Sequence, residues 1–162
     1  MRTVTRVGDI YKVTIDNGEV RFFQLIARDH CALNGDVIRI FSNHYYLDQS
    51  PSLEELVNNS IERYMHTYVI NGLKMGYWEK YGTSKEVGSL NLFFRSSLDI
   101  FYPRQNIVSK RWDIWKLNGH RIHVGELPKE CAKYEIGTVF APIAVMVQLT
   151  TGNYQEPCYP LY

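Results

Sequence analysis

Histidine and cysteine are the first side chains in this 162-residue sequence whose types and spacing could build a reactive site. His120 and His123 are three residues apart, and on a strand that separation places them on opposite faces, where they cannot share one metal ion. His66 lies in an apolar stretch, which is typical of a hydrogen-bonded interior histidine. His30 precedes Cys31, but adjacent strand residues point apart and no third group orients them. The sequence therefore predicts neither a metal site nor a nucleophilic dyad.

The carboxylates and glycines give no catalytic pattern either. Glu54 and Glu55 fit the first turn of a helix, where negative charge is favourable. Glu79 and Asp113 each lie beside a tryptophan and could line a cleft, but no spacing pairs them as acid and base. The sequence contains no P-loop, no dinucleotide-binding glycine motif and no Gly-x-Ser-x-Gly nucleophile elbow. We therefore expect no catalytic residue and no cofactor.

Aromatic and basic residues alternate between residues 102 and 116, and this segment is the best candidate for binding. Tryptophan, tyrosine and arginine are common at protein interfaces, and interleaved rings and cations also stack on nucleobases. The same pattern fits a strand of the core. On a strand, Trp112 and Ile114 share one face while Asp113 and Trp115 share the other, so at least one tryptophan lies outside the main core or under a second layer. The candidate contact residues are Trp78, Glu79, Arg104, Arg111, Asp113 and Trp115.

Charge and composition limit the classes of function. Lys and Arg number 18 and Asp and Glu 17, so the formal net charge of +1 gives no general argument for a nucleic-acid or anionic-membrane partner. The sequence has no apolar stretch that predicts a signal peptide or a membrane span. Three widely separated cysteines without a C-x-x-C motif fit small thiols in a reducing compartment. We therefore expect a cytoplasmic location.

The composition favours strands over helices. Tyrosine occurs 12 times and aromatic residues make up 14% of the chain, and these residues suit a pleated, half-buried surface. We expect one α+β, β-rich domain over residues 1–162, with a bent antiparallel sheet or a partly open SH3-like barrel. Alternating patterns and turn residues at Asn17-Gly18 and Asn34-Gly35 predict a three-stranded meander. The predicted strands cover residues 9–15, 20–27, 36–41, 90–95, 112–117 and 120–124.

One main helix is predicted over residues 52–63. Ser52 and Glu55 form a capping-box pattern, and the apolar residues that follow keep a helical spacing. Residues 64–70 are predicted as a strand that turns at Asn71-Gly72, with an extension of the helix as the alternative. One helical turn is expected at 128–134. A C-terminal helix is expected over 142–151, because Pro142 suits its first position and Gly152 its end, although the β-branched residues between them favour a strand.

The chain opens with Val-Gly-Asp-Ile-Tyr-Lys-Val at residues 7–13, followed by Asn17-Gly18 and a second strand. This opening resembles that of the immunity protein 26 family, bacterial proteins thought to neutralise toxins of polymorphic or contact-dependent systems. The resemblance implies a protein toxin as partner and carries over no catalytic residues. Further similarity extends over most of the chain, at Ser52-Leu53-Glu54-Glu55, His66-Thr67, residues 75–80 and Trp112-x-x-Trp115.

Two other resemblances imply enzymes. Some relatives of that family carry a phosphotriesterase-related label, but the sequence lacks the histidine and carboxylate cluster that two metal ions would need. The Gly-Asp-Ile opening also resembles the first strand of plasmid-maintenance ribonuclease toxins and other small SH3-like barrels. Those proteins use a basic groove, which a net charge of +1 disfavours.

The sequence thus favours a non-catalytic module that binds a protein toxin stoichiometrically. The alternative from another class is a small hydrolase or nuclease with a cleft near Trp78, His66 and Asp113. A third interpretation is a single-strand nucleic-acid binder that uses Arg111, Trp112 and Trp115. The sequence predicts no particular oligomeric state.

Overall fold

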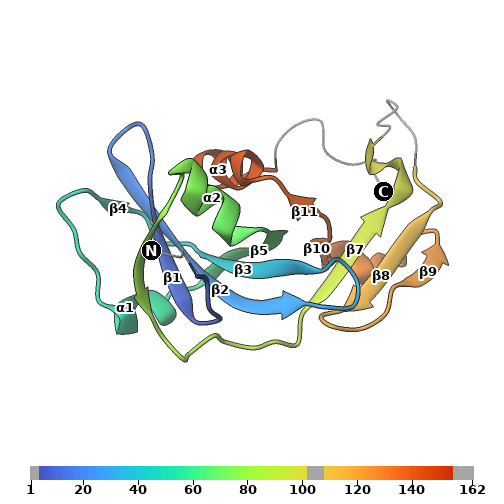
Figure 1. The fold of residues 1–162 in the computed structure, drawn as a ribbon. Helices are drawn as coiled ribbons and strands as arrows, with labels where there is room; N and C mark the ends of the chain where they lie inside the picture. The colour runs from blue at the N-terminus through green and yellow to red at the C-terminus, as the bar shows by residue number, and fades with distance from the viewer. Residues whose placement is uncertain (1–3, 102–107, 155–162) are drawn as a thin grey trace.

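Residues 4–101 and 108–154 are described by this computed structural model and form two β-sheets and three α-helices (Figure 1). The first sheet has the strand order β11-β5-β3-β2-β1-β6, with β4 paired to β2, and the second has the order β10-β7-β8-β9. The strands of the first sheet are β1 (Asp9–Thr14), β2 (Glu19–Asp29), β3 (Gly35–Phe41), β4 (Tyr45–Tyr46), β5 (Ile61–Thr67), β6 (Glu79–Thr83) and β11 (Val139–Phe140). Those of the second are β7 (Phe93–Ser97), β8 (Trp112–Lys116), β9 (Ile122–Gly125) and β10 (Glu135–Ile136).

The predicted α+β, β-rich fold and its opening meander are confirmed. The first sheet ends at β11 on one side and β6 on the other, so it is open and not a closed barrel. Register shifts in the pairings of β1, β2 and β3 bend the strands, as β-bulges do. The sheets are mixed and not purely antiparallel, because β11 runs parallel to β5 and β10 parallel to β7.

Both faces of the first sheet are buried, although the pattern of residues 9–15 predicted only one apolar face. Tyr11 and Val13 face a core that includes Val69 of α2 (Val69–Met75) and Val145 of α3 (Pro142–Thr151). Ile10 is equally buried on the other face, where it packs in a cluster with Leu56 of α1 (Leu53–Val57). The three helices thus divide between the two faces of this sheet.

The main helix is much shorter than the predicted 52–63. The Ser52 side chain accepts the Glu55 N–H and caps α1 as predicted, but the helix ends at Val57 with Asn58 as its C-cap. Asparagine and serine favour turns over helix, so the chain turns at 58–60 and continues as β5. Leu53, Val57 and Ile61 still pack in one cluster, because the strand residue Ile61 occupies the face that the helical spacing indicated.

The prediction of a hairpin at Asn71-Gly72 is wrong. These residues lie inside α2, which begins two residues after β5 ends, so the predicted strand 64–70 is a strand only as far as Thr67. The α2 helix ends at Gly76, whose φ of +74° is the left-handed conformation that glycine adopts most easily. The C-terminal helix is confirmed, with Pro142 in its first turn and Gly152 as its C-cap, and residues 129–133 form a 3-10 turn.

The Gly-Asp-Ile opening serves the fold. Asp9 is fully buried and accepts hydrogen bonds from the Arg6 N–H at 2.9 Å and the Thr83 hydroxyl at 2.8 Å. Its carboxylate also lies 2.8 Å from Lys80 Nζ, so it fastens β1 to the edge strand β6. Gly8 has a φ of +101°, and a Cβ there would lie 2.6 Å from the Ser84 carbonyl oxygen. Gly8 and Asp9 of this opening are therefore explained by local structure.

Candidate functional site

The two tryptophans of β8 are buried on opposite faces of the second sheet, as the alternation predicted. Trp115 is 2% exposed and packs with Phe94, Ile26 and Val37, so its ring joins the two sheets. Trp112 is also buried, and the Arg95 guanidinium lies 5.3 Å from the centre of its ring. Both rings therefore contribute to packing, and the accessible groups on this sheet are the polar residues around them.

A polar cluster of Asp113, Arg121 and His123 includes a cation over the ring of Trp115. Asp113 is opposite His123 in the β8–β9 pairing, and its Oδ1 lies 3.0 Å from His123 Nδ1. The other carboxylate oxygen is 3.9 Å from Arg121 Nε, and the Arg121 guanidinium lies 4.7 Å from the centre of the Trp115 ring. Side chains from both strands thus converge on one carboxylate above a rigid aromatic base.

The same hairpin offers apolar area and an open strand edge. Ile122 is 60% exposed, and the His123 side chain is 65% exposed. Among the described residues, β9 is the last strand of its sheet, so one side of its backbone faces no neighbouring strand. Arg111 extends the charged area and pairs with Asp99 at 3.2 Å. We call Arg111, Asp113, Arg121 and His123 the β8–β9 surface. Ile122 is opposite Ile114 in the β8–β9 pairing, so its side chain lies on the other face of the sheet.

Ion pairs on an exposed surface contribute little to stability, typically about 0–1 kcal/mol. The Arg111 and His123 side chains are each more than half exposed, with 52% and 65% of their area accessible. Such groups can exchange an internal partner for an external one at small energetic cost. The arrangement therefore suits recognition of another macromolecule.

Sequence reasoning identified Asp113 and Arg111 but missed Arg121 and treated His123 as an isolated solvent or capping residue. The Asn118-Gly119 turn is the sequence feature that could have placed these two residues opposite β8. Asn118 has a φ of +60°, and the tight turn sets the register that brings β9 opposite β8.

Two other predicted contact residues, Trp78 and Glu79, do not join the β8–β9 surface. Trp78 is buried in the core, where its indole N–H donates to the Val69 carbonyl at 3.0 Å and its ring meets Phe23 edge to face. Glu79 is exposed at the start of β6 and pairs with Lys12 at 3.9 Å. Arg104 lies outside the described residues.

The structure does not assemble the alternative cleft near Trp78, His66 and Asp113. Asp113 is at the surface of the second sheet, whereas His66 and Trp78 are buried. The centres of the His66 and Phe94 rings are 4.4 Å apart, whereas Trp78 packs against Phe23. In the described part of the chain, no hydrogen bond, ion pair or ring contact links any two of these three residues.

His66 is a hydrogen-bonded interior histidine, as predicted. Its Nε2 lies 3.0 Å from Asp29 Oδ2, and both side chains are fully buried. Asp29 Oδ1 also accepts the backbone N–H groups of Cys31 at 3.1 Å and Ala32 at 3.0 Å. Burial raises the pKa of Asp29, but the hydrogen bonds from His66 and from these backbone groups outweigh burial and lower the pKa to about 2. The pair thus fixes the β2–β3 turn against β5.

This depressed pKa predicts acid sensitivity. The folded state favours the Asp29 carboxylate, so its contribution is complete above the ordinary pKa of 3.8 and is lost as the pH falls towards 2. We expect the stability advantage of the wild-type chain over Asp29→Asn to shrink by roughly 2 kcal/mol between pH 5 and pH 2. Urea denaturation of both proteins across this range measures it. An advantage that stays constant with pH would contradict this assignment.

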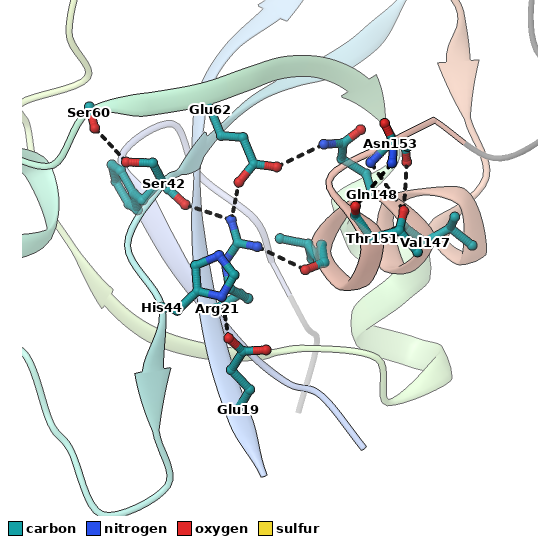
Figure 2. Close-up of polar contacts among 12 residues, drawn as sticks. Glu19, Arg21, Ser42, His44, Ser60, Glu62, Val147, Gln148, Thr151 and Asn153 are labelled. Atoms are coloured by element: carbon teal, nitrogen blue, oxygen red, sulfur yellow. Dashed lines mark hydrogen bonds and ion pairs between the residues drawn. The ribbon is translucent and has the colours of Figure 1, made fainter. Parts of the chain in front are cut away.

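A second buried cluster centres on Arg21 (Figure 2). Arg21 is 1% exposed and donates to the Leu149 carbonyl at 2.9 Å, the Phe41 carbonyl at 3.0 Å and the Glu62 carboxylate. Gln148 donates to the other Glu62 oxygen at 2.9 Å. The Leu149 carbonyl belongs to the last turn of α3, where a cation is favourable. Arg21 therefore binds the end of α3 to β2, β3 and β5.

Glu135 forms a third, partly buried cluster where the two sheets meet. It accepts the Tyr154 hydroxyl at 3.1 Å and the Tyr64 N–H at 3.4 Å. Burial raises the pKa of Glu135 and raises that of Tyr154 to about 12. The Arg63 guanidinium lies 4.1 Å from the centre of the Tyr154 ring. These contacts connect β10 of the second sheet to β5 of the first.

Over residues 4–101 and 108–154, no three His, Cys, Asp or Glu side chains are grouped so that they could hold a metal ion. The helices in this part of the chain are all too short or too polar to cross a membrane. No protein-family model, curated protein or solved structure matches this chain. The arrangement of its side chains is therefore the basis for assigning a function.

Proposed function

We propose that this chain is a non-catalytic binding module that neutralises a bacterial toxin by forming a stoichiometric complex with it. The β8–β9 surface carries the proposal. Asp113, Arg121 and His123 are grouped there, with the Arg121 guanidinium over the Trp115 ring and the open edge of β9 beside them.

The surface has the composition of a protein interface. Arginine is enriched at interface hot spots, and charged groups of both signs can complement the charges of a partner. Trp115 is held between the sheets, so Arg121 rests on a base that does not need to be ordered on binding. Preorganisation of this kind lowers the entropic cost of association.

A toxin is the partner that the resemblance to the immunity protein 26 family implies. The buried ionisable groups Arg21, Asp29 and His66 are held in internal contacts. This favours binding over acid–base catalysis, which requires such groups to face a substrate.

Reversing charge on the β8–β9 surface should weaken the complex without unfolding the chain. We expect Arg121→Glu to lower affinity for the toxin domain, to be sought among the products of neighbouring genes, at least tenfold, because the new carboxylate would repel Asp113 and leave Trp115. His123→Glu should have a similar effect, since it places a second carboxylate opposite Asp113 in the β8–β9 pairing. Calorimetric titration measures affinity and stoichiometry, and thermal unfolding checks each variant's fold.

Lys74→Glu is the matched control, because it makes the same reversal on an exposed residue of α2. It should bind as tightly as the wild-type chain. The proposal fails if the wild-type chain gives no binding heat with the toxin domain. If Lys74→Glu weakens binding and the two β8–β9 variants do not, the assignment of toxin binding to the β8–β9 surface is contradicted.

A further inference from the structure

A hollow of about 260 Å³ opens where the end of β2, the start of β3 and the first residues of α2 meet. Thr5, Arg28, Asp36, Tyr68 and Ile70 are among its lining residues, and none of the lining residues belongs to β8 or β9. Its volume is near the lower end of small-molecule pockets, which is about 300 Å³. The hollow is therefore a candidate ligand site separate from the protein-binding surface.

Asp36 places a carboxylate in this hollow, and among the described residues only one of its two oxygens accepts a hydrogen bond. The residue is 9% exposed, and its Oδ2 accepts the Val69 N–H at 3.0 Å. Its Oδ1 lies 3.6 Å from Arg28 Nε, which is too long for a hydrogen bond. Burial raises the pKa of Asp36, as expected for a carboxylate without a close cation. A ligand cation would find a buried acceptor here.

Arg28 supplies a neighbouring cation with spare donors. Its Nη2 donates to the Thr5 carbonyl at 2.9 Å, and its side chain is 44% exposed. Within the described residues, its Nη1 has no hydrogen-bond acceptor. Asp29, by contrast, already uses both oxygens on His66 and the β2–β3 turn. The available charges in the hollow are thus one anion and one cation, side by side.

We propose that this hollow binds a free α-amino acid, with its ammonium on Asp36 and its carboxylate on Arg28. An α-amino acid carries opposite charges on adjacent groups, which matches the adjacent Asp36 and Arg28 side chains. Tyr68 and Ile70 supply an aromatic and an aliphatic wall for an apolar side chain. Tyr68 is 42% exposed, and an aromatic ring attracts a nearby ammonium group.

Titration of the full chain with L-leucine tests this site, followed by calorimetry or by amide chemical shifts. L-leucine should bind, whereas leucine methyl ester, which lacks the carboxylate, and N-acetyl-leucine, which lacks the ammonium, should each bind at least tenfold more weakly. No change with millimolar L-leucine would overturn the proposal. Equal binding of all three compounds would show that the site does not recognise the ammonium and carboxylate charges, and it would also overturn the proposal.

Two variants locate the binding. Asp36→Asn keeps an oxygen for the Val69 N–H and removes the charge, and Arg28→Gln removes the cation on a partly exposed side chain. Each should weaken L-leucine binding at least tenfold. Glu54→Gln is the control, because α1 packs against the opposite end of β2, and it should leave binding unchanged. Wild-type affinity in both pocket variants would contradict the assignment.

Discussion

Replacement of Gly72 by alanine is expected to destabilise the chain, although alanine is the better helix former. Helix propensity alone would favour the alanine by about 1 kcal/mol. A Cβ at this position, however, would lie 1.9 Å from Trp78 Cζ2 and 2.2 Å from Cε2. The indole cannot withdraw easily, because it packs against Phe23 and donates to the Val69 carbonyl. We expect a net loss of roughly 2–3 kcal/mol in the free energy of unfolding.

Urea denaturation of Gly72→Ala measures this loss. Asn71→Ala is the control, because it adds the same helix former at the preceding, exposed position of α2. The control should match the wild-type chain or exceed it slightly. A Gly72→Ala protein as stable as the wild-type chain would show that the Trp78 ring does not occupy the described position.

Removal of the Arg21 guanidinium should cost still more. Arg21→Met leaves the Glu62 carboxylate without its cation and the Phe41 and Leu149 carbonyls without their donor. Breaking a buried ion pair from one side typically costs about 3–5 kcal/mol. We also expect α3 to lose protection from amide exchange first, because its last turn is held by this side chain.

Lys110→Met gives the matched comparison. Lys110 pairs with Glu126 at 3.1 Å, but both side chains are largely exposed, so its loss should cost less than about 1 kcal/mol. Chemical denaturation of the two variants separates the buried pair from the exposed one. An Arg21→Met variant that loses no more stability than Lys110→Met would contradict the role assigned to Arg21.

Local patterns predicted those elements whose signals lie within a few residues. The Asn17-Gly18 turn and the alternation around it gave the meander, and Pro142 with Gly152 marked the C-terminal helix. The prediction for 52–63 was wrong in its second half, because Ile61 shares a cluster with the α1 residues although it is on a strand. Apolar residues of a helix and of the strand that follows it can therefore show a helical spacing when they are buried in the same cluster.

The contacts that the sequence did not reveal join distant segments. Arg21 and Leu149 are 128 residues apart, and Asp29 and His66 are 37 apart. Gly72 was interpreted as a turn residue, but its role is to admit the Trp78 ring, which only tertiary packing specifies. Within the β8–β9 surface, Asp113 was found from its aromatic neighbours, whereas Arg121 needed the strand register.

Hydrogen–deuterium exchange of the chain alone and with saturating toxin domain tests the proposed mode of binding most directly. The account predicts slower exchange for the amides of β8 and β9 in the complex, and unchanged exchange in α1 on the first sheet. Protection confined to segments outside the second sheet, or no change in any amide at saturation, would contradict it.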